Sequence, residues 1–368
     1  MQIVADNTIP YLQGVIEPLG EVNYLPAGQF TAEAVREADL LIVRSIDKCT
    51  REVLEGSRVK LITTATIGFD HIDTAYCDQA GIVWRNAPGS NARSVAQYLL
   101  ASIVALSVRN DIPLKGKTIG IIGVGHVGSE VERLCRAFGM QVLRNDPPRA
   151  EREGNEGFVS LETIAHEADI ITLHTPLTRQ GNHPTYHLAN RAFFDQLRRK
   201  PLFINAARGA VHDTQALLDA YRQGTISRMI IDCWENEPNI SYELLQAADI
   251  ATPHIAGFSA DGKANATRMC LEHISQFFRV EIEEIGRVTP PPPSSPIIDL
   301  KKCDHHPVEQ AILTAFDPVA VDQKLREAPT RFEWYRTNYH YPREFEAYRV
   351  TGNSEAQELL QRLGFCVE

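Results

Sequence analysis

A glycine-rich turn between an apolar strand and an amphipathic helix constrains the fold of this chain most. Lys117-Thr-Ile-Gly-Ile-Ile leads into Gly123-Val-Gly125-His-Val-Gly128, and helical periodicity runs from Val127 to Phe138. In G-x-G-x-x-G the first glycine permits a tight turn, the second lets the backbone approach a pyrophosphate, and the third allows close helix–strand packing. This context predicts a dinucleotide-binding turn, although an ordinary structural βαβ turn can also carry such glycines.

The end of the next predicted strand indicates which dinucleotide is bound. Asp146 stands there, and a carboxylate at this place accepts hydrogen bonds from ribose hydroxyls and repels a 2′-phosphate. The prediction is therefore NAD rather than NADP. Arg144 and Arg149 lie nearby in the sequence and temper that preference.

Short apolar runs alternate with amphipathic stretches along most of the chain. Helical patterns such as Thr214 to Arg222 separate many of the runs, and an apolar stretch from Ser94 to Val108 predicts a helix between two lobes. This alternation predicts the α/β class, with parallel sheets covered on both faces. The predicted strands are Leu40–Val43, Leu61–Thr64, Ile82–Trp84, Thr118–Ile122, Gln141–Leu143, Ile170–Leu173, Leu202–Ile204, Met229–Ile231 and Asp249–Ala251.

A proline tract separates a tail of different composition. Pro290 to Pro293, followed by Ser294, Ser295 and Pro296, predicts a stiff connector. The tail interleaves aromatic residues with arginines, a pattern typical of either nucleic-acid binding or a buried protein interface. The net charge of −10 favours a subunit interface and argues against nucleic acid. The longest apolar stretch, Tyr98 to Val108, is too short to span a bilayer, so no membrane partner is expected.

The seven cysteines are scattered and form no C-x-x-C pair. This pattern favours reduced thiols in a cytoplasmic protein. No basic residue precedes Arg36, so a signal peptide is not predicted. Cys303-Asp304-His305-His306 contains metal-ligand residue types, but adjacent histidines in a polar loop are more often solvated, and no metal is predicted.

Three polar residues follow the last three predicted strands. They are Arg208, Glu237 and His254. Because ligands bind beyond the carboxyl ends of parallel strands, we expect these side chains to share one crevice. His can exchange a proton near neutral pH, Glu can orient it, and Arg can bind an anionic substrate. Taken singly, each has a structural alternative: a core histidine, a Glu-Pro turn or a surface arginine.

Several motifs in order resemble the D-isomer-specific 2-hydroxyacid dehydrogenase family. They are Gly68-Phe-Asp70-His-Ile-Asp73, Asn86-Ala-Pro88-Gly89-Ser-Asn91, the glycine turn, His174-Thr-Pro176-Leu-Thr178, Ala207-Arg208-Gly209, Asp232 with Glu237-Pro238, and Pro253-His254. The resemblance implies a flavodoxin-like substrate-binding domain at 1–93 plus 258–286. It also implies a Rossmann-type, doubly wound NAD-binding domain at 94–257.

The resemblance also implies roles for individual residues. Arg208, Glu237 and His254 would be catalytic, and Ser45, Thr66 and Phe258 would meet the substrate. The implied NAD contacts are Gly123, Gly125, His126, Val127, Gly128, Asp146, Thr175, Ala206, Ala207, Arg208, Asp232 and Gly257.

Arg44-Ser45, Ala65 to His71 and the tail resemble one branch of this family more narrowly. That branch oxidises a phosphorylated hydroxy acid in pyridoxal phosphate synthesis and forms homodimers through a small α+β carboxyl-terminal domain, here 287–368. Phe258 stands where the branch usually has Tyr. The residue that binds the phosphate stays open among Arg44, Arg93, Arg336 and Arg343. The alternatives are another 2-hydroxyacid dehydrogenase, such as phosphoglycerate dehydrogenase, or an NAD-sensing corepressor-like binding protein.

Overall fold

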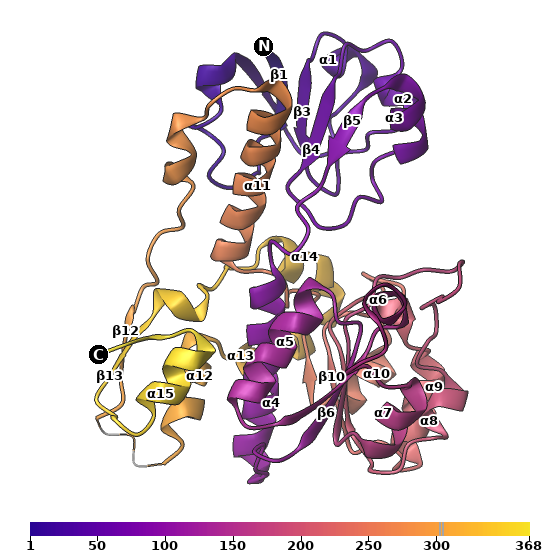
Figure 1. Cartoon of the computed structure of the whole chain (residues 1–368), viewed down its shortest axis with the longest axis vertical. Helices are drawn as coiled ribbons and strands as arrows, with labels where there is room; N and C mark the ends of the chain where they lie inside the picture. Colours follow the sequence, from indigo (N-terminus) through magenta and orange to yellow (C-terminus); the bar gives the residue numbers. More distant parts are fainter. Residues whose placement is uncertain (302, 304) are drawn as a thin grey trace. The chain divides into compact units, whose positions relative to one another are not determined.

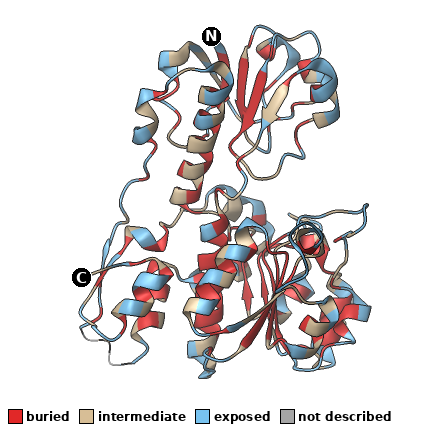
Figure 2. Cartoon of the chain, in the orientation of Figure 1, coloured by how far each residue is buried: buried red, intermediate tan, exposed pale blue. Residues whose placement is uncertain are grey.

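The computed structural model describes residues 1–301, 303 and 305–368. The chain divides into two compact units (Figure 1). The first unit comprises Met1–Asn91 and Ser259–Pro291, and the second comprises Ala92–Phe258 and Pro292–Glu368. In each unit the buried residues concentrate in the strands and on the helix faces that cover them (Figure 2).

The first unit is built on a parallel sheet with the strand order β2-β1-β3-β4-β5. This is the flavodoxin-like order. Leu40 and Ile42 belong to one apolar cluster and Leu41 and Val43 to another, so both faces of the sheet are covered. The elements are β1 (Gln2–Asp6), β2 (Glu21–Leu25), α1 (Ala32–Val35), β3 (Leu40–Val43), α2 (Arg51–Leu54), β4 (Leu61–Thr64), α3 (Thr74–Ala80), β5 (Val83–Arg85) and α11 (Ala260–Phe278).

The second unit contains a larger parallel sheet with the strand order β11-β10-β9-β8-β6-β7. Because β6 lies between β7 and β8, the chain winds away from it in both directions, and ligands bind at such a switch point. The elements are α4 (Ala92–Asn110), β6 (Thr118–Ile122), α5 (His126–Ala137), β7 (Gln141–Asn145), α6 (Pro147–Glu153), α7 (Leu161–Glu167), β8 (Ile170–Leu173), α8 (Arg191–Phe194), β9 (Leu202–Asn205), α9 (Thr214–Arg222), β10 (Arg228–Ile231), α10 (Tyr242–Ala247) and β11 (Ile250–Ala251).

The carboxyl-terminal segment of the second unit adds a small sheet with the parallel order β12-β13-β14. Its Ile298 and Val350 belong to the same apolar cluster as Leu99 of α4, so this segment shares a core with the larger sheet. Its elements are β12 (Ile297–Asp299), α12 (Pro307–Ala315), α13 (Pro318–Glu327), α14 (Phe332–Thr337), β13 (Arg349–Thr351), α15 (Gln357–Leu363) and β14 (Cys366–Val367).

The predicted α/β class with parallel sheets is confirmed. Four of the predicted strands, β3, β4, β6 and β8, begin and end at the predicted residues, and α4 extends the predicted helix at both ends. Residues 94–106 of α4 are buried without interruption, as expected of a helix that is apolar all round. Strands β1 and β2 were not predicted. The sequence of β2 shows no continuous apolar run, because β2 is an edge strand whose residues are exposed or half-buried.

Among the described residues, no helix combines the length and the apolarity needed to cross a bilayer.

Candidate active site

The glycine turn connects β6 to α5, as predicted. Gly123 has φ +89°, and a Cβ there would lie 2.7 Å from the carbonyl of His174. A Cβ on Gly128 would lie 2.1 Å from the Gly123 oxygen, so packing alone requires both glycines. A Cβ on Gly125 would meet nothing within 4 Å. The space over Gly125, at the amino terminus of α5 where His126 and Val127 form the first turn, therefore suits an approaching pyrophosphate.

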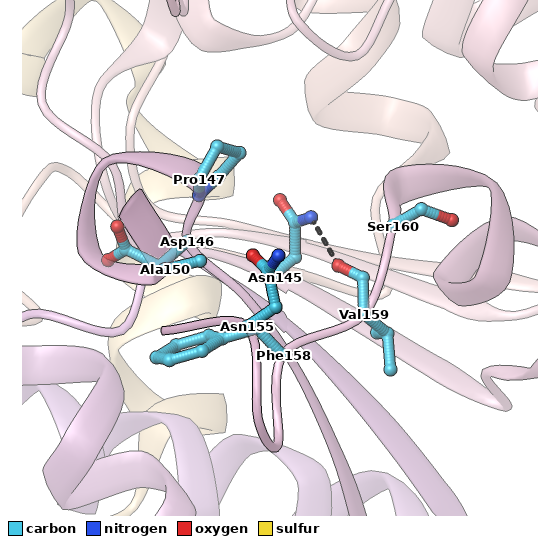
Figure 3. A pocket seen from close by; sticks show the side chains of 8 residues that line it. All are labelled: Asn145, Asp146, Pro147, Ala150, Asn155, Phe158, Val159 and Ser160. Carbon is cyan, nitrogen blue, oxygen red and sulfur yellow. Dashed lines mark hydrogen bonds between the residues drawn. The ribbon is translucent and has the colours of Figure 1, made fainter. Parts of the chain in front are cut away.

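A cavity of about 300 Å³ lies beside Asp146 (Figure 3). The Asp146 carboxylate accepts hydrogen bonds from the backbone N–H of Val124 (2.8 Å) and of Arg149 (2.9 Å), which fixes its orientation at the start of α6. The cavity is within the size range of small-molecule sites and suits an adenosine group. Its lining residues are Asn145, Asp146, Pro147, Ala150, Asn155, Phe158, Val159 and Ser160.

Arg144 and Arg149, the two cations that weaken the predicted preference for NAD, both bind other groups of the protein. The Arg149 guanidinium pairs with Glu153 at 2.8 Å and donates to the Val124 carbonyl at 2.7 Å. The Arg144 guanidinium donates to the Gly157 carbonyl at 2.9 Å. Since both cations have partners, the Asp146 carboxylate dominates this end of the site and favours NAD.

The turn after β8 contributes polar atoms that lack partners. The Thr175 hydroxyl and Nδ1 of His174 are buried, and neither has a hydrogen-bond partner among the described residues. Burial lowers the pKa of His174 to about 3, so its ring is neutral at physiological pH. The Thr175 side chain lies beside Gly123. An unpaired buried hydroxyl next to the glycine turn is consistent with a polar ligand such as NAD.

His254 and Glu237 form a hydrogen-bonded pair. The distance between His254 Nδ1 and Glu237 Oε2 is 2.7 Å, and the second carboxylate oxygen accepts the Trp234 N–H at 2.8 Å. Burial raises the pKa of Glu237, but the bond from His254 and the other polar neighbours outweigh it and hold the pKa below its ordinary value. An ionised carboxylate on Nδ1 leaves Nε2 as the atom that exchanges a proton.

His254 adopts φ +56°, a left-handed conformation that is uncommon for residues other than glycine. The backbone around it is held by Asp232, whose carboxylate accepts the Thr252 hydroxyl (2.6 Å) and the N–H groups of Ile255 (2.8 Å) and Ala256 (3.0 Å). Such a conformation persists only where surrounding bonds fix it. Asp232 thus shapes the loop that carries His254. The sequence predicted an NAD contact for Asp232 but did not predict this structural role.

Arg208, after β9, is exposed. Its guanidinium donates to the Ala207 carbonyl at 2.7 Å. Burial and the charges of Asp232 and Glu237 raise the pKa of the Cys233 thiol, and the charge of Arg208 is among those that oppose them. The 2.7 Å bond between His254 and Glu237 shows that the loops after β10 and β11 meet, and the convergence of Arg208 with them stays a prediction. Ala206 and Ala207, the predicted NAD contacts that precede Arg208, are buried.

Cys233, Glu237 and His254 also place possible metal-ligand atoms within 4.8 Å of one another. Metal binding needs a thiolate and a free ring nitrogen. Here burial favours the protonated thiol and Nδ1 is bonded to Glu237, whereas Nε2 stays free to exchange a proton, so the arrangement fits proton transfer. Asp304, part of the other group considered as metal ligands, lies outside the described residues.

The predicted substrate contacts fall in both units. Phe258, which follows Gly257 in the second unit, lies near two tyrosine rings of the carboxyl-terminal segment, with centroid distances of 6.4 Å to Tyr339 and 5.9 Å to Tyr341. In the first unit, Ser45 is exposed after β3, and the Thr66 hydroxyl donates to the Gly68 carbonyl at 2.8 Å. The sequence did not predict the two tyrosines as neighbours of Phe258, because no local pattern links them.

Comparison with known proteins agrees with this geometry. Residues 96–256 match the family described as D-isomer specific 2-hydroxyacid dehydrogenase, NAD binding domain, and residues 289–364 match a domain of unknown function, DUF3410. The crystal structure of a D-lactate dehydrogenase from Aquifex aeolicus, complexed with NAD and lactic acid, superposes with a TM-score of 0.59 at 27% identity, covering 79% of this chain and 100% of that one.

Two relatives span nearly the whole chain. A Porphyromonas gingivalis protein named erythronate-4-phosphate dehydrogenase is 49% identical over 367 residues, which cover 99% of this chain and 100% of that protein. A Bacteroides thetaiotaomicron protein of the same name is 51% identical over 354 residues, which cover 96% and 99%. The chain therefore belongs to the family of erythronate-4-phosphate dehydrogenases, within the D-isomer-specific 2-hydroxyacid dehydrogenases.

Proposed function

We propose that this chain oxidises 4-phospho-D-erythronate at C2 with NAD, giving (R)-3-hydroxy-2-oxo-4-phosphooxybutanoate, as a step of pyridoxal 5′-phosphate synthesis. The observation that carries the proposal is the 2.7 Å bond between His254 and Glu237 in a unit that also holds a dinucleotide-binding turn. The relatives that share nearly the whole chain supply the identity of the substrate.

His254 and Glu237 act together in the proposed reaction. His254 Nε2 accepts the proton of the C2 hydroxyl, and the Glu237 carboxylate stabilises the imidazolium that forms. Bound NAD supplies the acceptor for the C2 hydride, so the alcohol loses two electrons and two hydrogens while NADH and one proton are released. Arg208 binds the substrate carboxylate and the developing carbonyl oxygen with its forked donors.

Other residues bind rather than react. The residues proposed for NAD are the glycine turn with His126 and Val127, Asp146 at the adenosine cavity, Thr175, the 206–208 segment, Asp232 and Gly257. Ser45, Thr66 and Phe258 are proposed to meet the substrate.

The contacts of two candidate arginines bear on which one binds the substrate phosphate. Arg93 pairs with the Glu346 carboxylate at 2.5 Å, whereas Arg44 donates to the neutral Thr8 hydroxyl at 2.8 Å. This difference favours Arg44 as the phosphate ligand.

The test is NADH formation, followed by absorbance, with 4-phospho-D-erythronate, 3-phosphoglycerate, glycerate and D-lactate. We expect the highest kcat/KM for 4-phospho-D-erythronate and no useful turnover of the unphosphorylated acids. A preference for 3-phosphoglycerate would support the phosphoglycerate dehydrogenase alternative. NAD binding without turnover of any acid would support the NAD-sensing alternative. The homodimer through 287–368 and the cytoplasmic location stay predictions, and light scattering on the purified chain checks the first.

A further inference from the structure

The carboxyl-terminal segment contributes to the core beneath the catalytic loops. Leu325 of α13 and Phe332 of α14 are fully buried in the same apolar cluster as Trp234 and Ala207. Trp234 directly follows Cys233, and Ala207 directly precedes Arg208. The α13–α14 segment (residues 318–337) therefore shares one apolar cluster with residues of the two loops that carry Glu237 and Arg208.

One carboxylate of this segment holds the edge of the larger sheet. Strand β11 is an edge strand, and the outward N–H of Ala251 donates to Asp322 Oδ1 at 2.7 Å. Asp322 is 7% exposed and is itself fixed by Arg326, whose Nε lies 2.8 and 3.0 Å from its two oxygens. The Arg326 guanidinium also donates to the carbonyls of Leu245 (2.6 Å) and Ala248 (2.7 Å).

This contact lies directly before the catalytic histidine. Ala251 is followed by Thr252, Pro253 and His254, and the left-handed backbone of His254 depends on where β11 ends. An unpaired N–H on a buried edge strand would be costly, so Asp322 fixes both the strand and the residues that follow it.

The next helix of the segment, α14, shares an apolar cluster with the loop that carries Glu237. Arg336 of α14 is half-buried, and its positive charge is one of the influences that hold the pKa of Glu237 below its ordinary value. Tyr335, next to it, packs on the cluster that contains Trp234, and the Tyr339 ring lies 6.4 Å from Phe258. The geometry thus places α14 and the turn after it along the catalytic loops.

We propose that the α13–α14 segment, within a domain of unknown function, positions the catalytic pair, because Asp322 fixes the strand that leads to His254. Asp322 is a positioning residue that acts through His254. The inference rests on the proposed proton transfer by this pair and adds a role for the segment besides any part in dimerisation.

The NMR signals of the His254 ring separate this inference from the proposed function. Asp322→Ala should change these signals, and Asp317→Ala should leave them unchanged, whether or not the chain turns over any hydroxy acid. If turnover fails with every substrate while Asp322→Ala changes the signals, the substrate assignment is wrong and the positioning role of Asp322 stands. If the enzyme is active and Asp322→Ala leaves the signals unchanged, the positioning role is wrong and the proposed function stands.

Asp322 is tested by Asp322→Ala against Asp317→Ala. Asp317 caps the start of α13 by accepting the Val319 N–H at 2.9 Å, so its loss weakens the same helix without touching β11. We expect kcat to fall about tenfold in Asp322→Ala with KM for NAD unchanged, because a misplaced base costs rate rather than cofactor affinity. Asp322→Asn keeps an acceptor for Ala251 and recovers most of kcat. Equal losses of kcat in the two alanine variants at matched thermal stability would show a merely structural role.

Discussion

The glycine turn and the His254–Glu237 pair lie in the same unit but are built in different ways. The turn is made by one continuous stretch from β6 to Asp146, and its shape is set by backbone packing around Gly123 and Gly128. The pair is assembled from the ends of separate strands, and its surroundings include Asp322 and Arg336 from the far end of the chain. A site formed by one stretch of chain tolerates changes elsewhere, whereas a site assembled from several strands depends on every element that holds it.

The largest expected effect comes from removing the base of the assembled site. His254→Ala should lower kcat by roughly 10²–10⁴-fold, as loss of a general base does, while the NAD dissociation constant stays close to that of the wild type. Steady-state kinetics and fluorescence titration with NAD measure the two quantities. His166→Ala on α7 is the control and should leave both unchanged. Ordinary turnover in His254→Ala would show that another group accepts the proton.

The same contrast explains which features the sequence predicted. The turn, Asp146 and the parallel strands follow from local patterns. The position of Arg208, Glu237 and His254 after consecutive strands predicted a shared crevice, and the structure shows the contact between Glu237 and His254. The sequence did not predict the contributions of Asp322 and Arg326, because an acid and a base four residues apart on a helix look like an ordinary surface pair. Their role depends on which edge strand the helix meets, and only the packed structure decides that.

The next test concerns the local site and separates folding from ligand binding. Gly125 has φ −77° and ψ −150°, which any residue adopts, and a Cβ there meets nothing within 4 Å. Gly125→Ala should therefore keep the thermal stability of the wild type but weaken NAD binding about tenfold or more, because the methyl group occupies the space proposed for the pyrophosphate. Calorimetric titration with NAD measures the loss.

Gly128→Ala provides the matched comparison. Its Cβ would lie 2.1 Å from the Gly123 oxygen, so the turn itself must move, and we expect a loss of roughly 1–3 kcal/mol in the free energy of unfolding. If Gly125→Ala binds NAD as tightly as the wild type, the pyrophosphate does not approach the backbone at this position.

The first unit contains a second assembled feature, at the loop that carries Ser45. Asp6 at the end of β1 and Asp47 after β3 are 1% and 0% exposed. The Asp47 carboxyl accepts the N–H groups of Gly28 (2.8 Å) and Arg44 (2.7 Å). Asp6 Oδ1 accepts both the N–H and the hydroxyl of Thr8, each at 2.6 Å. Burial and the neighbouring Asp6 carboxyl raise the pKa of Asp47 to about 6, so Asp47 keeps its proton to a higher pH than a free carboxyl.

Replacing Asp6 by an amide is the test with the smallest expected effect. Because native Asp47 holds a proton that the unfolded chain releases near pH 4, the stabilising contribution of this proton is complete below about pH 4 and is lost as pH rises through about 6. Asp6→Asn supplies a permanent N–H, so the free energy of unfolding near pH 8 should rise by roughly 1–3 kcal/mol and its decline between about pH 4 and 6 should flatten. Urea denaturation over a pH series measures both.

Asp39→Asn is the opposite control. The Gln2 N–H and Lys60 lower the pKa of Asp39, so that variant should lose stability above about pH 4. If Asp6→Asn instead loses stability near pH 8 as Asp39→Asn does, the Asp6 carboxylate is stabilising there and does not raise the pKa of Asp47.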